Sequence, residues 1–201
     1  MKFFLSSFKL GRNPEKLFEL FGANKRIAII PNAKDNYDPK YRKERLEEER
    51  NSLNNLGLIP EEVDLKDYFG REESLESVLD KFGGVWVVGG NTFVLRVAMR
   101  KSGFDKWIKE KLSDKEFVYA GYSAGICILA PTLKGLDIVD NPKEVEEVIW
   151  EGLGILDYSI APHFRSDHPE SESVEKEVEY LKKNNMSFKT LSDGDIIILE
   201  K

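Results

Sequence analysis

Residues 121–125 read Gly-Tyr-Ser-Ala-Gly, a Gly-x-Ser-x-Gly pattern between an apolar strand-like run and an apolar helix-like run. A serine held on a tight turn between a strand and a helix can attack a carbonyl carbon, and only small residues fit two positions before and after it. The pattern alone arises easily by chance, but this position makes it specific. We predict that Ser123 is a nucleophile and that the backbone N–H of Ala124 stabilises the oxyanion.

A serine hydroxyl needs a base to take its proton, and the chain offers two histidines, His163 and His168. His163 follows the strand-like run 160–162, which predicts a place at the end of a strand, so we favour it as the base. His168 lies in a polar loop, and we expect a surface residue there.

The base in turn needs a carboxylate to orient its ring. Asp193 is well placed in a turn before the last predicted strand, and Asp137 is well placed in the irregular segment after the serine helix. The full set of candidates is Asp137, Asp140, Asp157, Asp167, Glu170 and Asp193.

A second glycine turn, Gly89-Gly90-Asn91-Thr92, ends another apolar run and precedes a predicted helix. We predict that the backbone N–H of Gly90 supplies the second oxyanion donor, and that Asn91 and Thr92 contact the substrate. Glycines before a helix also suit phosphate groups. The turn lacks both Gly-x-Gly-x-x-Gly and the lysine of a P-loop, so a nucleotide site is the less favoured interpretation.

Short apolar runs rich in β-branched residues alternate along the chain with stretches of helical period. This alternation is typical of an α/β fold with a largely parallel sheet, and we predict one domain over residues 1–201, with residues 2–6 as an edge strand. The predicted strands are 2–6, 26–30, 63–65, 84–88, 116–120, 159–162 and 196–199, and the predicted helices are 14–21, 41–56, 74–82, 93–101, 104–112, a run ended by Pro131, and 171–184.

The composition excludes several classes of protein. A chain of 201 residues with 41% hydrophobic and 33% charged residues folds, and its net charge of −6, with acids and bases interleaved, disfavours a nucleic-acid partner. No apolar run approaches the ~20 residues of a membrane-spanning helix. One cysteine, Cys127, and two histidines are too few for a disulfide or a structural zinc site. The charged run 40–50 is interpreted as a solvated helix face.

Several of these motifs together resemble peptidase family S51, the peptidase E and cyanophycinase family of serine peptidases. The motifs are the turn at 89–93, the serine turn at 121–125, Pro131-Thr132 and Pro162-His163-Phe164. The resemblance covers residues from about 25 onward. It implies a three-layer α/β sandwich like those of flavodoxin and the class I glutamine amidotransferases, with Ser123 as nucleophile, His163 as base and no metal or cofactor.

The resemblance bears on the acid and on specificity as well. In this family, acids at both candidate places have been assigned as the third member of the triad, which orients the histidine. We choose Asp193 for this role, with Asp137 as the alternative. Members that cleave after aspartyl residues carry a Gly-Glu-Thr-Arg-like stretch after the histidine, whereas residues 169–173 here lack arginine. The chain therefore looks closer to an uncharacterised branch than to peptidase E itself, with Arg165 as a candidate substrate-binding cation.

These observations predict a cytoplasmic serine peptidase, monomeric or homodimeric, that hydrolyses small peptides, with dipeptides containing aspartate as candidate substrates. An esterase or amidase would use the same groups on another acyl bond. A member of the same fold that binds a small ligand without catalysis is the alternative from a different class. Neither nucleic acid nor a membrane is an expected partner.

Overall fold

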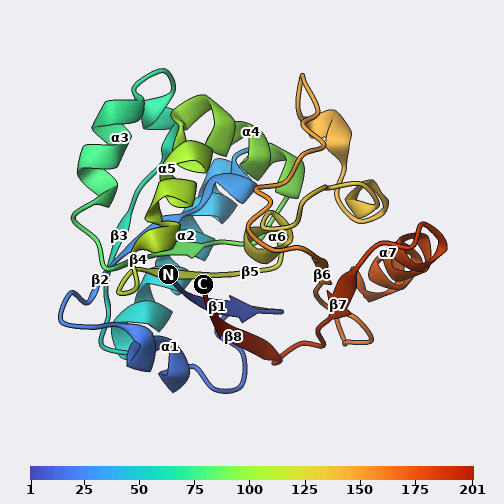
Figure 1. The fold of residues 1–201 in the computed structure, drawn as a ribbon, viewed down its shortest axis with the longest axis horizontal. Coiled ribbons are helices and arrows are strands. Elements are labelled where there is room, and N and C mark those ends of the chain that lie inside the picture. Colours follow the sequence, from blue (N-terminus) through green and yellow to red (C-terminus); the bar gives the residue numbers. More distant parts are fainter.

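The computed structural model describes residues 1–201 as an α/β fold around a six-stranded sheet with the order β3-β2-β4-β5-β1-β8 (Figure 1). All neighbouring strands in this sheet are parallel except β1 and β8. This agrees with the expected largely parallel sheet. The sheet strands are β1 (Lys2–Ser6), β2 (Arg26–Ile30), β3 (Ile59–Glu62), β4 (Gly84–Val87), β5 (Val118–Tyr122) and β8 (Ile196–Glu200).

Helices cover both faces of the sheet, which gives three layers (Figure 1). The central strands send alternate side chains to opposite faces, so that Val85 and Val87 of β4 pack in one core while Trp86 packs in the other. Helices α3 to α6 cover the first face, and α1 and α2 cover the second. Their bounds are α1 (Glu15–Leu20), α2 (Pro39–Asn55), α3 (Glu72–Leu79), α4 (Thr92–Ser102), α5 (Phe104–Glu110) and α6 (Ala124–Cys127).

Residues 159–190 form a smaller substructure beside the central sheet. Strands β6 (Ser159–Ala161) and β7 (Phe188–Thr190) form a separate parallel pair, and α7 (Ser171–Lys183) packs on it through Val174 and Val178. The predicted strand at 159–162 is therefore present, but it lies outside the central sheet. The sequence analysis missed β7 because only Phe188 of its three residues turns away from solvent.

Two further predictions about the sheet are wrong. Strand β1 is not at an edge, because β8 returns antiparallel beside it and takes the edge position. The strand expected at 63–65 lies at Ile59–Glu62, where only Pro60 is buried and no apolar alternation marks it. None of the helices is long and apolar enough to cross a membrane.

The charged run 40–50, interpreted from sequence as solvated, contains one buried acid, Glu49 of α2. Glu49 is only 6% exposed. Its two carboxylate oxygens accept hydrogen bonds from Trp86 Nε1 at 2.8 Å and from the Tyr122 hydroxyl at 2.7 Å. Glu49 thus ties α2 to β4 and to β5, one residue before Ser123.

Replacing Glu49 with alanine is expected to lower the free energy of unfolding by about 3 kcal/mol, because two buried donors lose their acceptor. Urea denaturation measures the change. Glu44→Ala, at an exposed position of the same helix, is the control and should leave stability within about 0.5 kcal/mol of wild type. Equal stability of the two variants would contradict a structural role for Glu49.

Candidate active site

Ser123 occupies a sharp turn between β5 and α6. Its backbone torsions, φ 49° and ψ −120°, lie in a region that non-glycine residues rarely adopt. The flanking glycines allow this geometry, because a Cβ would come within 2.6 Å of the Val87 carbonyl oxygen at Gly121 and within 2.2 Å at Gly125. The side chain of Ser123 is therefore presented at the carboxyl edge of the sheet on a turn that no bulkier sequence could form.

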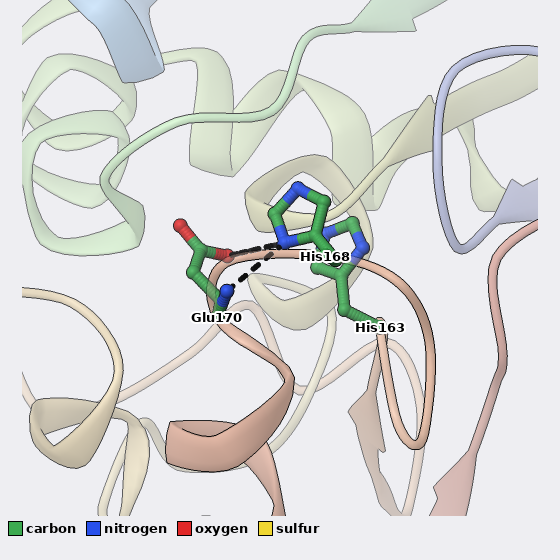
Figure 2. A group of neighbouring side chains, drawn as sticks. All are labelled: His163, His168 and Glu170. Atoms are coloured by element: carbon green, nitrogen blue, oxygen red, sulfur yellow. Dashed lines mark hydrogen bonds and ion pairs between the residues drawn. The ribbon is translucent and has the colours of Figure 1, made fainter.

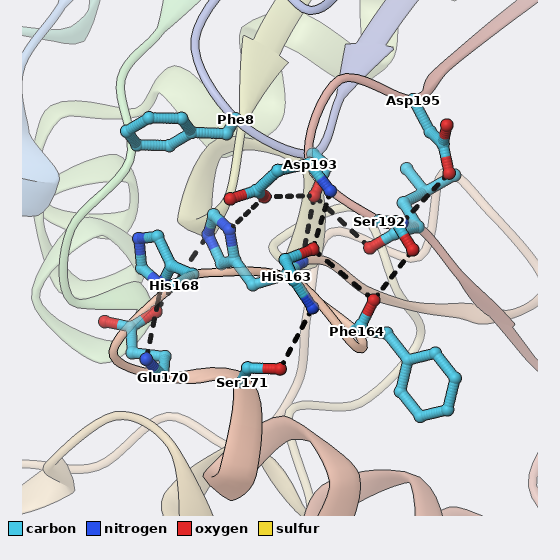
Figure 3. A network of polar contacts seen from close by, with 12 residues as sticks. Phe8, His163, Phe164, His168, Glu170, Ser171, Ser192, Asp193 and Asp195 are labelled. Carbon is cyan, nitrogen blue, oxygen red and sulfur yellow. Dashed lines mark hydrogen bonds and ion pairs between the residues drawn. The ribbon is translucent and has the colours of Figure 1, made fainter.

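His163 follows β6 and is paired with a carboxylate. Its Nδ1 lies 2.7 Å from Asp193 Oδ1, in the turn that precedes β8 (Figure 3). The residue is only 1% exposed, and its backbone φ of 60° is again in the left-handed region. Asp193 therefore fixes the ring so that Nδ1 carries the proton and Nε2 is the basic nitrogen.

A buried serine at the end of β1, Ser7, joins the two halves of this pair. Its hydroxyl donates to Asp193 Oδ1 at 3.0 Å and accepts from the backbone N–H of His163 at 2.8 Å. The Asp193 N–H in turn donates to Ser166 Oγ at 2.7 Å. The central sheet, the loop after β6 and the turn before β8 are thus connected by one set of hydrogen bonds.

Burial lowers the pKa of His163 below its ordinary value, and the hydrogen bond to Asp193 opposes that shift only in part. The imidazole is consequently neutral at neutral pH, which is the form a general base requires. The edge of the Phe8 ring also packs against it, with ring centroids 5.7 Å apart.

His168, expected from the sequence to be a surface residue, stacks on His163. The ring centroids are 3.7 Å apart and the planes differ by 10°. The Glu170 carboxylate lies 3.9 Å from His168 Nδ1 and 4.0 Å from His163 Nε2 (Figure 2). These three side chains are the group that could be considered for a metal ion. An ion must lie in the plane of each imidazole, and two parallel planes this far apart share no such point, so the observed geometry does not favour a metal centre.

The predicted oxyanion turn lies beside Ser123. Gly90 has φ 147°, and a Cβ there would lie 2.4 Å from the Ala33 carbonyl oxygen, so the turn requires glycine. Ala124 is the first residue of α6, so its N–H lies in the first turn of the helix, where amides lack an internal partner. Asn91 caps α4 by accepting from the N–H groups of Phe93 and Val94. Its side chain is committed to that cap rather than to the crevice.

A crevice of about 270 Å³ lies over these residues. Ser123, His163 and Gly90 line it together with His168 and Glu170. Its remaining walls come from segments that the sequence analysis did not connect with the site, namely Phe8, Lys9, Lys34, Tyr37, Tyr41, Arg45, Glu48, Glu49, Gly89 and Tyr122.

Comparison with known proteins identifies the family. The model of peptidase family S51 matches residues 9–201. The chain belongs to peptidase family S51. It is therefore a peptidase, and the serine type fits this family.

Relatives of this S51 peptidase cover most of its length. It is 31% identical to the uncharacterised peptidase Lmo0363 of Listeria monocytogenes over 92% of this chain and 87% of that protein. It is 31% identical to peptidase E of Streptomyces coelicolor over 61% of this chain and 51% of that protein. A crystal structure of a putative peptidase E from Listeria monocytogenes superposes with a TM-score of 0.77 at 26% identity, covering 100% of this chain and 98% of that one.

Besides Asn91 and Thr92, which do not line the crevice of this S51 peptidase, two more of the predicted site residues lie away from it. Asp137 is exposed, and its carboxylate accepts from the backbone N–H of Gly135 rather than from His163. Arg165 is exposed, with its guanidinium over the ring of Phe164. Asp137 is therefore not the acid that orients the base in this structure, and Arg165 does not line the crevice.

Several residues of the site escaped the sequence analysis. Ser7 and Lys34 follow strands β1 and β2, and the end of a parallel strand was the one signal that could have identified them. Lys34 Nζ donates to the Gly89 carbonyl oxygen at 2.6 Å, beside Gly90, and burial lowers its pKa. Lys34 is therefore a cation next to the predicted oxyanion turn. The sequence analysis had considered Arg165 as the substrate-binding cation.

Replacing Asp193 with asparagine is expected to lower kcat about 1,000-fold to 10,000-fold, because the amide stabilises the wrong tautomer of His163. Asp137→Asn is the matched control and should stay within about twofold of wild type. Hydrolysis rates measured on both variants, with thermal unfolding to show that each is folded, test this assignment. Loss of activity in the Asp137 variant and not in the Asp193 variant would reverse it.

Proposed function

We propose that this peptidase hydrolyses small peptides through an acyl-enzyme on Ser123. Ser123 Oγ attacks the scissile carbonyl carbon while His163 Nε2 accepts its proton. His163 then gives that proton to the departing amine as the C–N bond breaks. A water molecule, deprotonated by the same nitrogen, attacks the ester carbonyl and releases the acid with regeneration of Ser123.

The observation that carries this proposal is the common location of a strained serine and a neutral, carboxylate-paired histidine. Ser123 and His163 line the same crevice, although they come from positions 40 residues apart in the chain, on separate sheets. Strain at Ser123 and the Asp193 pair on Nδ1 are both features that packing alone does not need. We assign the oxyanion to the N–H groups of Gly90 and Ala124. Ala124 follows Ser123 in the chain, and Gly90 follows Gly89, which packs against Ser123.

A ligand-binding protein without catalysis is the alternative that a specific observation favours. His163 Nε2 makes no hydrogen bond to Ser123; the carboxylate nearest to it is Glu170, at 4.0 Å. Catalytic hydrogen bonds are often long in unliganded enzymes and tighten when substrate enters, so the peptidase remains the better supported function. An esterase or amidase would use the same catalytic geometry, so only the substrate distinguishes it from a peptidase. The cytoplasmic location stays a prediction.

We further propose that the substrates are dipeptides with an acidic side chain, bound by Lys34. Lys34 is mostly buried, contacts Gly89 and retains two ammonium protons for a ligand. A substrate carboxylate in the crevice needs such a cation, because burying it without one is costly. Lys34 also faces the charge of Glu170, whose raised pKa it partly offsets.

A dipeptide library separates these functions. Wild type is expected to hydrolyse at least one dipeptide with N-terminal aspartate, and Ser123→Ala is expected to lose at least about 1,000-fold in kcat while still binding it. Release of free amino acids and calorimetric binding are the measurements. Equal turnover by both proteins would exclude Ser123 as nucleophile, and binding without turnover by wild type would favour the ligand-binding alternative.

Lys34→Met is expected to raise KM for an Asp-X dipeptide at least about tenfold, since a charge-assisted hydrogen bond to the side-chain carboxylate is lost. For an Ala-X dipeptide, where that bond does not exist, KM should hardly change. Arg165→Met is the control and should behave as wild type on both substrates. An equal loss on both substrates would mean that Lys34 supports the turn at Gly89 rather than specificity.

A further inference from the structure

An acidic residue of α7, Glu177, is buried without a partner. Its neighbours on the inward face of the helix, Val174, Val178 and Leu181, are apolar, and Glu177 itself is only 1% exposed. Its Oε2 makes no hydrogen bond. A buried carboxyl oxygen left unpaired costs free energy, so its presence in a hydrophobic face points to a ligand that is absent from the structure.

Glu177 lines a small chamber next to the nucleophile. The chamber has a volume of about 10 Å³, close to that of one water-sized particle. Ser123, His163 and Glu170 border both this chamber and the crevice, so the two spaces adjoin at these residues. The chamber is lined by Thr92, Ser123, Ala124, Cys127, Leu136, Val139, Asp140, Pro162, His163, Glu170, Val174 and Glu177.

The polar atoms around the chamber are mostly acceptors. Asp140 Oδ2 accepts from the Thr92 N–H at 2.8 Å, and Thr92 Oγ1 is a buried oxygen without a hydrogen-bond partner of good geometry. Three carboxyl groups, those of Asp140, Glu170 and Glu177, face the chamber, and no lysine or arginine does. One water molecule could fill hydrogen bonds here, but it would not compensate the charge that these acids carry when they are ionised.

Burial favours the neutral forms of the two inner acids, and a cation bound between them would favour the charged forms. Burial raises the pKa of Glu177 to about 8 and that of Asp140 to about 6. The charge of Asp140 also raises the pKa of Glu177, and the charges of Glu170 and Glu144 raise that of Asp140. Burial likewise raises the pKa of the Cys127 thiol well above its ordinary value, so Cys127 contributes a neutral wall.

We propose that this chamber binds a small monovalent cation, held by the carboxylates of Glu177 and Asp140 and by the Thr92 hydroxyl. Two sources share this chemistry, a potassium or free ammonium ion and the primary ammonium group of a substrate. The second source rests on the function proposed above. The α-amino group of an N-terminal residue lies two bonds from the carbonyl carbon that Ser123 attacks, and Ser123 borders the chamber.

Thermal unfolding in potassium chloride, ammonium chloride and choline chloride at equal ionic strength tests the free ion, because choline is too large to enter. If a free ion is bound, potassium or ammonium raises the Tm of wild type, and Glu177→Gln abolishes the rise. Glu175→Gln, at an exposed position of the same helix, keeps it. This readout needs no turnover, so it is independent of the proposed function.

Calorimetric binding to Ser123→Ala tests the substrate ammonium. Binding of the dipeptide identified in the library and of its N-acetylated form is measured to Ser123→Ala and to the double variant that also carries Glu177→Gln. A substrate ammonium in the chamber predicts at least tenfold weaker binding of the free dipeptide to the double variant and no change for the acetylated form. If neither the Tm rise nor this difference depends on Glu177, the cation site is wrong and Glu177 is buried as a neutral acid.

Discussion

The close approach of the Ser123 turn to the end of β4 is the constraint on which the site depends. The Val87 carbonyl oxygen lies so near both Gly121 and Gly125 that neither position can carry a side chain. This contact forces α6 against the sheet and turns the side chain of Ser123 outward, at the cost of a strained backbone at that residue. Gly90, in the turn that follows β4, is fixed in the same way by the Ala33 carbonyl. The two turns that flank the crevice are thus set by packing between backbones, before any catalytic side chain is placed.

The sequence predicted the parts of this arrangement that are local. A turn that needs glycine leaves a pattern within five residues, and buried parallel strands leave apolar runs, so Ser123 and the strands beside it could be identified directly. The choice between Asp137 and Asp193 could not be made in this way, because each lies about thirty residues from His163 along the chain. What decides it is the hydrogen-bonded position of Ser7 at the end of β1, where the loop after β6 meets the turn before β8. Such a meeting point has no signature in a single sequence.

The sequence analysis also could not predict which charged residues are buried. Glu49 and Glu177 both lie in helices rich in charge, where the ordinary expectation is a solvated side chain. Each is turned inward in the structure, but with opposite consequences. Glu49 is fully paired by Trp86 and Tyr122 and stabilises the packing of α2 on the sheet. Glu177 has an unpaired oxygen and lines a chamber that Ser123 also borders, and burial without pairing is the feature on which its proposed role rests.

The charges around Ser123 are separated in a way that would orient a substrate. Lys34 lines the crevice, whereas Glu177 lines the chamber, and Ser123 borders both. A dipeptide with N-terminal aspartate carries its ammonium group and its side-chain carboxylate on two branches of the Cα that bears the scissile carbonyl. Bound with each charge next to its complement, such a peptide would have that carbonyl over Ser123 in one orientation only. Under the proposed assignments, a pose that exchanges the two branches brings like charges together in both places, so the same groups that bind the substrate exclude its unproductive pose.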